Sequence, residues 1–399
     1  MPHGEPVLQS LLILLAVAVL GPVAAIRLRI PTAVLLILAG IVLGPAGFGV
    51  LQDTAMVGFL AHFGFLVLMF MAGMEIDFDS IRSAGLRSLL RPLLVIVGVA
   101  VCTTLAARLL RLGSVSALVV SAIAVGLPLA TLKETGHAGQ RLGRHIMLTA
   151  SIGEFFVILA VTGVELAHHG GLSLHTAVRI GKIVVLLFVC ALVIRFVRAL
   201  VWWFPERFHR LIQHHDVAEL GVRVGLLIML TFVAISALAG VEPILGAFLG
   251  GMLVAIVLRQ KDVLEGKIAA LGNGLFIPIF FVVVGVRFDA SALDRSAVLH
   301  AAVLVGTAGL CKLVPALLIA PVGFGLRERL ATGCLLSAPL TLVVAIAAIG
   351  RTLDLISAST QASLVLVGIM LSIAFPVLFK LLAPPALHGT AAERHAAGT

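Results

Sequence analysis

The sequence predicts an all-α polytopic membrane protein of about thirteen transmembrane helices, with inverted-topology repeats and two broken, crossing helices. Three observations lead to this fold class: an apolar composition, a series of apolar segments of membrane-spanning length, and paired motifs that recur at one sequence offset. Of the 399 residues, 61% are hydrophobic and only 12% are charged. Soluble domains are about half apolar and about a quarter charged, so a bilayer accommodates this composition and a soluble fold does not.

The apolar segments set the number of spans. A membrane-spanning helix needs roughly 20 mostly apolar residues. The thirteen candidates cover approximately residues 7–25, 30–50, 55–74, 90–110, 114–133, 146–168, 176–200, 218–239, 243–258, 267–286, 296–323, 328–350 and 360–383. We therefore expect one transmembrane unit over residues 1–383, followed by a short cytoplasmic tail at 384–399.

The Lys and Arg residues between the spans predict an orientation. The loops that follow odd-numbered spans, together with the C-terminal tail, carry 19 of the 28 basic residues, and the loops on the other side carry seven. Because cytoplasmic loops are enriched in Lys and Arg, we expect a multi-pass inner-membrane protein with its N-terminus outside and its C-terminus in the cytoplasm. These loops also explain the net charge of +9, so the charge does not indicate a nucleic-acid partner.

An internal repeat connects the two halves of the chain. The segment FLVLMFMAGMEID at 65–77 resembles IPIFFVVVGVRFD at 277–289, and their glycines, Gly73 and Gly285, are 212 residues apart. Seven spans separate the two copies, and because seven is odd the copies would cross the membrane in opposite senses. Inverted repeats of this kind are typical of secondary transporters. The predicted copies cover about 30–168 and 243–383.

The second repeated motif contains prolines. Pro128 and Thr131 in span 5 correspond to Pro339 and Thr341 in span 12, at a proline offset of 211 residues. A proline within a span leaves a backbone carbonyl unpaired, which is tolerated only where it lines a cavity or the protein interior. We predict that the two spans are broken helices that cross near the midplane, where freed carbonyls and the Thr hydroxyls could coordinate a dehydrated cation. The prolines alone fit simple kinks equally well, and the repeat favours the crossing.

Glu154 is the strongest single candidate for the chemistry. It lies in span 6, one helical turn after Ser151, with apolar residues on both sides. A carboxylate at that depth is costly and marks a functional site by default. It could hold a proton or a cation but not comfortably both, and such competition at one site is sufficient for exchange. The alternative is a structural Glu that pairs with a basic residue of another helix.

Lys312 lies in the middle of span 11. A buried ammonium group needs a carboxylate partner or loses its charge, and Glu154 is the expected partner. In that case Lys312 would hold the empty site closed and release Glu154 when a cation enters, and the alternative is a purely structural ion pair. The four Cys show no metal-ligand spacing, and the chain has no Walker motif, so we expect no cofactor, no metal besides the monovalent cation at Glu154, and no enzymatic activity.

Several of these segments together resemble the monovalent cation:proton antiporter-2 family, the Kef-type and Nap-type exchangers. The matching segments are IPTAVLLILAGIVLGPAGFGVL at 30–51, FLVLMFMAGMEIDFDSIR at 65–82, LKETGHAGQRLGRHIMLTASIGEF at 132–155, ILGAFLGGMLVA at 244–255, PIFFVVVGVRFD at 278–289, and the span of Lys312. The resemblance covers nearly the whole chain. It implies a thirteen-helix, sodium/proton antiporter-like fold in which a core domain with spans 5, 6, 11 and 12 moves against a dimerisation domain. It also implies a homodimer.

The resemblance assigns roles to individual residues and shows where this chain departs from the family. Glu154 stands where the family carries its ion-binding Asp, and Lys312 where some members carry a basic partner. The family usually has Asn, Asp or Gln before the acid, but here that residue is Gly153. Kef-type proteins often carry a nucleotide-binding domain after the last span. This sequence ends shortly after its last predicted span, so we expect such regulation to be absent or to lie on a separate regulatory subunit.

The sequence therefore predicts exchange of Na⁺ or K⁺ for H⁺ by alternating access, with Glu154 as the shared site in the lipid bilayer. Two alternatives remain open at this point. The chain could be a same-fold transporter of another solute, such as an organic anion held by Lys312, or a membrane sensor that does not transport.

Overall fold

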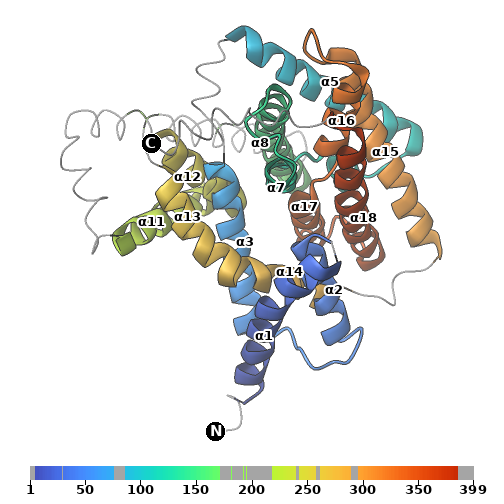
Figure 1. The fold of residues 1–399 in the computed structure, drawn as a ribbon. Helices are drawn as coiled ribbons and strands as arrows, with labels where there is room; N and C mark the ends of the chain where they lie inside the picture. The colour runs from blue at the N-terminus through green and yellow to red at the C-terminus, as the bar shows by residue number, and fades with distance from the viewer. Residues whose placement is uncertain are drawn as a thin grey trace. The chain divides into compact units, whose positions relative to one another are not determined.

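The computed structural model describes residues 5–28, 30–75, 86–170, 218–239, 242–257, 261–288 and 295–384, with the single residues 181, 192 and 195. Every regular element in these ranges is helical (Figure 1). Ten helices there are long and apolar enough to cross a membrane, and two shorter apolar helices cover Thr32–Leu43 and Pro243–Ile256. Together they match all the predicted spans except 176–200, which lies almost entirely outside the described residues. The all-α membrane fold is confirmed, and the total of thirteen spans stays a prediction.

The chain forms two compact units. The first consists of Met1–Asp79, Phe155–Ala301 and Val344–Leu366, and the second of Ser80–Glu154, Ala302–Val343 and Val367–Thr399. The first unit contains α1 (Glu5–Leu28), α2 (Thr32–Leu43), α3 (Ala55–Met74), α11 (Ala218–Leu238), α12 (Pro243–Val257), α13 (Lys261–Leu271), the π-helical turn η2 (Gly272–Phe276) and α14 (Ile277–Val286). The second contains α5 (Leu86–Leu110), α6 (Ser114–Ser121), α7 (Gly126–Glu134) and α16 (Leu326–Leu336). Four helices contribute residues to both units: α8 (Arg141–Gly170), α15 (Arg295–Ile319), α17 (Leu340–Thr352) and α18 (Ala358–Leu382).

Two helix pairs in the first unit pack through the glycines of the repeated motif. A Cβ atom on Gly73 of α3 would collide with the backbone carbonyl of Phe248 in α12. Likewise, a Cβ atom on Gly285 of α14 would collide with the carbonyl of Ile37 in α2. Small residues let membrane helices approach this closely, so that their backbones touch. The two motif glycines, 212 residues apart in the sequence, therefore serve the same purpose on two different helix pairs.

The tenth predicted span contains a feature that the sequence analysis did not foresee. Helices α13 and α14 are joined without a break by the π-helical turn Gly272–Phe276, which is followed by Pro278. A proline lacks the N–H group, and its ring displaces the carbonyl four residues earlier. A single widened turn before the proline relieves this clash while the helix continues.

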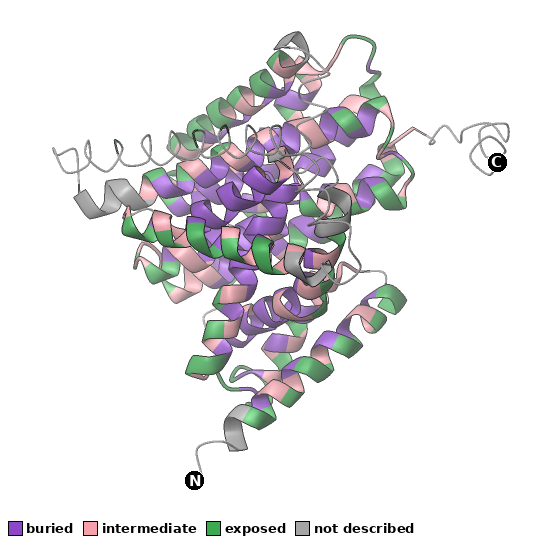
Figure 2. Ribbon diagram, turned by 90° about the vertical axis from the view of Figure 1, so that its left-hand side faces the viewer, coloured by how far each residue is buried: buried purple, intermediate pink, exposed green. Residues whose placement is uncertain are grey.

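Large apolar side chains remain exposed along the outer faces of several helices. On α1, Leu8 is 73% exposed and Ile26 is 78% exposed, and exposed residues recur along the helix nearest the N-terminus in Figure 2. An apolar surface of this extent is unusual for a protein in water. Contact with lipid chains explains it, in agreement with the membrane-spanning lengths.

Two predicted spans of the second unit contain interruptions. Helix α6 ends at Ser121 and α7 begins at Gly126, while α16 ends at Leu336 and α17 begins at Leu340. Pro128 lies in the first turn of α7, and Pro339 lies directly before α17. The interruption between α6 and α7 therefore precedes Pro128, whereas the interruption between α16 and α17 has Pro339 as its last residue. In both places a new helix starts close to the proline, because the N–H groups of the first turn have no acceptor within the helix and a proline is accepted well there.

Candidate functional site

The candidate site is built around the four residues 122–125 that separate α6 from α7. The end of a helix leaves carbonyl groups without partners at its C-terminus and N–H groups without partners at its N-terminus, with partial negative and positive charge respectively. One such carbonyl, that of Val120, and one such N–H group, that of Val125, each bind a charged side chain from another helix.

Glu154 provides the negative charge. Its side chain projects from α8 and is only 1% exposed. Its Oε2 atom accepts a hydrogen bond of 2.9 Å from the backbone N–H of Val125, the residue directly before α7. The carboxylate therefore lies at the positive end of the α7 dipole, where negative charge is stabilised. A buried carboxylate held in this way can bind positive charge, either as a proton or as a cation.

Lys312 provides the positive charge. Its side chain comes from α15, is fully buried, and donates a hydrogen bond of 2.7 Å from Nζ to the carbonyl of Val120 in the last turn of α6. The ammonium group thus lies at the negative end of the α6 dipole. Lys312 and Glu154 consequently bind the two sides of one helix interruption, five residues apart along the chain. A direct ion pair between them stays a prediction.

The backbone partners of these two charges were not predicted from the sequence. Freed carbonyls were expected to bind a cation, whereas the Val120 carbonyl accepts a hydrogen bond from Lys312 and the Val125 N–H group donates one to Glu154. The available signal was Gly126 followed closely by Pro128, a pair that favours the start of a new helix at that position.

Gly153 leaves space for the interrupted segment to pack beside Glu154. A Cβ atom at residue 153 would lie 3.1 Å from the Cδ1 and Cγ2 atoms of Ile123. Ile123 is buried in the middle of the interruption, with 1% exposure. The absence of a side chain on α8 at this point therefore leaves room for Ile123, beside the residue that carries the carboxylate. This packing gives a structural reason for the departure noted in the sequence.

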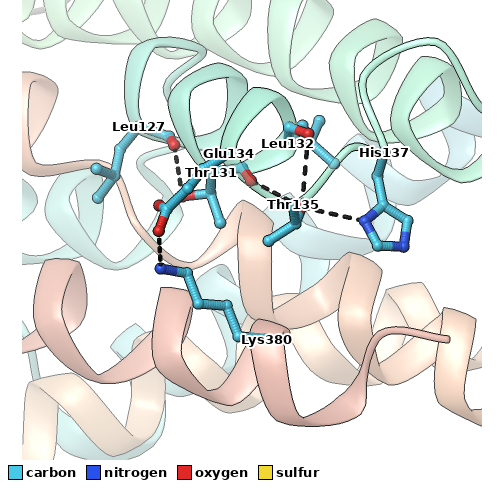
Figure 3. A network of polar contacts seen from close by, with 7 residues as sticks. All are labelled: Leu127, Thr131, Leu132, Glu134, Thr135, His137 and Lys380. Atoms are coloured by element: carbon cyan, nitrogen blue, oxygen red, sulfur yellow. Dashed lines mark hydrogen bonds and ion pairs between the residues drawn. The ribbon is translucent and has the colours of Figure 1, made fainter. Parts of the chain in front are cut away.

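The two predicted hydroxyl ligands are both buried. Ser151 is 4% exposed on α8, one turn before Glu154, and Thr131 is 3% exposed on α7. The Thr131 hydroxyl donates a 2.9 Å hydrogen bond to the carbonyl of Leu127 in its own helix (Figure 3). Its hydrogen is thus engaged within α7, and only the oxygen lone pairs are suited to a cation. The roles of Ser151 and Thr131 as ligands stay predictions.

The second interruption lies at residues 337–339. The Pro339 carbonyl accepts the N–H of Val343 at 3.0 Å, so it is engaged in the first turn of α17. Ser337 is buried, and its hydroxyl donates to the carbonyl of Gly333 at 2.8 Å. Thr341 is partly buried in α17. The crossing of the two interrupted spans, and a cation-binding role for Thr341, stay predictions.

A polar network holds the far end of α7. Lys380 of α18 forms an ion pair of 2.6 Å with Glu134, the last residue of α7. The ring of His137 lies 3.0 Å from the hydroxyl of Thr135 through Nδ1 and 2.8 Å from the carbonyl of Pro384 through Nε2. Figure 3 shows these side chains gathered where α7 ends. The network therefore fixes the C-terminal end of α7 against the end of α18.

The chain matches a known family of membrane proteins. Residues 13–382 match the model of the family described as sodium/hydrogen exchanger, transmembrane. The chain is 29% identical over 395 residues to the YjbQ protein of Bacillus subtilis, covering 93% of this chain and 62% of that one. It is 24% identical over 375 residues to the Na⁺/H⁺ antiporter of Enterococcus hirae, covering 93% of this chain and 96% of that one. The chain thus spans less than two thirds of the first relative and nearly all of the second.

A solved structure shows the same fold. The sodium proton antiporter MjNhaP1 from Methanocaldococcus jannaschii, determined at pH 8, superposes with a TM-score of 0.63 at 15% sequence identity, covering 96% of this chain and all of that one. The family-model match extends over nearly the whole chain, and it supports the resemblance seen in the sequence. This chain therefore belongs to the transmembrane sodium/hydrogen exchanger family, whose members are transporters and not enzymes.

Proposed function

We propose that this protein exchanges a monovalent cation, Na⁺ or K⁺, for H⁺ by alternating access, with Glu154 as the shared binding site. The observation that carries the proposal is the position of Glu154: a carboxylate with 1% exposure that accepts the N–H group at the start of α7. Family membership and the names of the relatives support the same exchange. Na⁺ and K⁺ are both retained as candidate substrates.

Competition at one carboxylate explains the coupling. A protonated Glu154 is neutral and has little attraction for a cation, whereas an ionised Glu154 attracts one. Each reorientation of the site therefore carries either a proton or a cation, and one full cycle exchanges the two in opposite directions. Lys312 holds the end of α6 and offsets the charge of Glu154 when no cation is bound. Ser151 and Thr131 are proposed to complete the coordination with neutral oxygens.

The architecture that this mechanism requires is also a proposal. The matching glycine contacts of Gly73 and Gly285 support inverted repeats over about 30–168 and 243–383. The second unit contains α6, α7, α16 and residues 302–319 of α15, which supports a core domain formed by spans 5, 6, 11 and 12. We further propose an inner-membrane homodimer with its N-terminus outside and its C-terminus in the cytoplasm.

Proton flux in sealed proteoliposomes tests the function. The purified chain would be reconstituted in vesicles that contain a pH-sensitive dye and an imposed pH gradient, and Na⁺, K⁺, Li⁺ or choline would be added outside. We expect Na⁺ or K⁺ to dissipate the gradient and choline to leave it unchanged. A folded protein that responds to no cation would contradict the proposal and favour an organic anion as substrate or a role without transport.

A further inference from the structure

A group of cationic and hydrogen-bonding side chains surrounds the loop between α15 and α16. Arg91, near the start of α5, donates to the carbonyl of Ala320 at 3.4 Å. Arg141, the first residue of α8, donates to the carbonyl of Val322 at 2.7 Å. His145 follows Arg141 by one helical turn and is 8% exposed. All of these residues belong to the second unit.

One buried aromatic ring holds two of these side chains in place. The guanidinium carbon of Arg141 lies 5.2 Å from the ring centroid of Phe324, within the range of a cation–π contact. The ring of His145 meets the same ring edge-on, with centroids 5.5 Å apart and an interplanar angle of 88°. Phe324 is 4% exposed. The two side chains are therefore positioned before any ligand arrives.

Among the described residues, the group has hydrogen-bonding capacity to spare. The Nε2 atom of His145 is buried and has no hydrogen-bond partner there, although buried polar groups are normally paired. None of the ion pairs in the described part of the chain includes Arg91 or Arg141. Each guanidinium carries five N–H donors, and the carbonyl contacts above engage one of them. Two positive charges and one buried nitrogen thus lie around one loop, and no carboxylate of the described residues is bonded to either arginine.

We propose that Arg91, Arg141 and His145 form a binding site for the phosphate group of an anionic phospholipid. The guanidinium group matches phosphate oxygens with parallel hydrogen bonds, and the N-terminus of α8 adds a favourable helix dipole. Basic groups between transmembrane helices are suited to anionic lipid headgroups. The site also lies on the side of the membrane that the distribution of Lys and Arg predicts to be cytoplasmic.

The surrounding surface favours a lipid over a soluble phosphate compound. Leu318, Val322 and Leu326 belong to the segment that the arginines contact, and they are 77%, 74% and 68% exposed. These side chains provide an apolar surface for acyl chains directly beside the phosphate site. A soluble anion would bind the arginines and leave this surface uncovered.

Lipid titration of the purified full-length chain tests the proposal. Delipidated protein in detergent micelles would be titrated with dioleoylphosphatidylglycerol, with dioleoylphosphatidylcholine and with inorganic phosphate, and bound molecules would be counted by native mass spectrometry. We expect saturable binding of phosphatidylglycerol only. Arg91→Gln and Arg141→Gln should each weaken it by about tenfold or more, the effect of losing a charge-assisted hydrogen bond. His145→Leu should also weaken binding, and His145→Gln, which keeps a donor, should retain more of it.

Arg108→Gln provides the matched control, because it removes the same charge from an exposed position near the other end of α5. Its affinity for phosphatidylglycerol should equal that of the wild type. Folding of each variant would be checked by its melting temperature and its elution on size exclusion. Equal binding of phosphatidylglycerol by the wild type and the Arg91, Arg141 and His145 variants would overturn the site. Saturable binding of inorganic phosphate without a preference for phosphatidylglycerol would overturn the lipid as its ligand.

Discussion

Replacing Gly153 by Ala tests the packing that brings the helix interruption to Glu154. The added methyl group would lie 3.1 Å from two side-chain carbons of Ile123, whereas carbon atoms prefer a separation of about 3.5–4.0 Å. Ile123 must therefore retreat by about 0.4 Å or more. Overpacking of this kind costs about 1–3 kcal/mol, and the higher helix propensity of Ala offsets about 0.5–1 kcal/mol. The net destabilisation is about 1 kcal/mol.

The same displacement should affect the ion site. Ile123 lies two residues before Val125, whose N–H group reaches Glu154 at 2.9 Å. If Val125 moves with Ile123 by the same distance, about 0.4 Å, that hydrogen bond lengthens to about 3.3 Å, just beyond the usual upper limit of about 3.2 Å for N–H···O distances. We therefore expect Gly153→Ala to lower the melting temperature in detergent and to raise the cation concentration needed for half-maximal proton flux.

A double-mutant cycle separates this contact from other effects of the substitution. Ile123→Ala removes the two carbons nearest to the new methyl group and leaves only Cβ, at 3.2 Å, so the combined variant should lose less stability than the sum of the two single variants. Contacting residues typically couple by about 0.5–3 kcal/mol. Additive losses in the double variant, or a Gly153→Ala protein with unchanged melting temperature and flux, would refute the reasoning.

Three further predictions concern other contacts. Lys312→Met leaves the Val120 carbonyl without its donor, so it should remove about 1.5–3 kcal/mol of stabilisation and slow cation-driven proton flux. Thermal melting would measure the first effect and flux assays the second, and unchanged values would contradict a role of Lys312 at the end of α6. Lys380 and Glu134 form a largely exposed ion pair, so their coupling energy in a double-mutant cycle, measured by thermal melting, should be below about 1 kcal/mol. A larger coupling energy would show that the network at the end of α7 is more than a surface contact. Gly73→Val places a side chain against the backbone of α12, so little folded protein should be recovered on size exclusion; a normal yield would contradict the close approach of α3 and α12.

Much of the fold was predictable because membrane spans depend on the length and polarity of each segment. Span 2 shows the limit of this approach. It was expected over 30–50, but α2 ends at Leu43 and is followed by a turn at Gly44. The turn contains Gly44, Pro45 and Gly47 but no charged residue, so a count of apolar length alone ran through it, although Gly followed by Pro favours a turn. The π-helical turn before Pro278 escaped prediction because an inserted residue in a helix leaves no pattern in composition.

The site was only partly predictable. Glu154 and Lys312 were identifiable because charged residues are rare inside apolar segments. Their partners were not identifiable, because the Val120 carbonyl and the Val125 N–H belong to residues without distinctive chemistry. The packing of Ile123 against Gly153 depends on tertiary contact between α8 and the interruption, and no single segment contains that information. The positions of Pro128 and Pro339 predicted that the two spans are interrupted; one interruption lies just before Pro128 and the other ends with Pro339.

The most direct test of the account compares Glu154→Gln with Asp354→Asn in proteoliposomes. Both substitutions convert a carboxylate to an amide, but Glu154 is 1% exposed and the side chain of Asp354 is 89% exposed. Cation-driven proton flux and uptake of radioactive Na⁺ or of Rb⁺ as a tracer for K⁺ would be measured for each protein. The account predicts that Glu154→Gln abolishes both movements and that Asp354→Asn leaves both unchanged. Coupled flux that persists in a correctly folded Glu154→Gln protein would show that cation and proton share a different site.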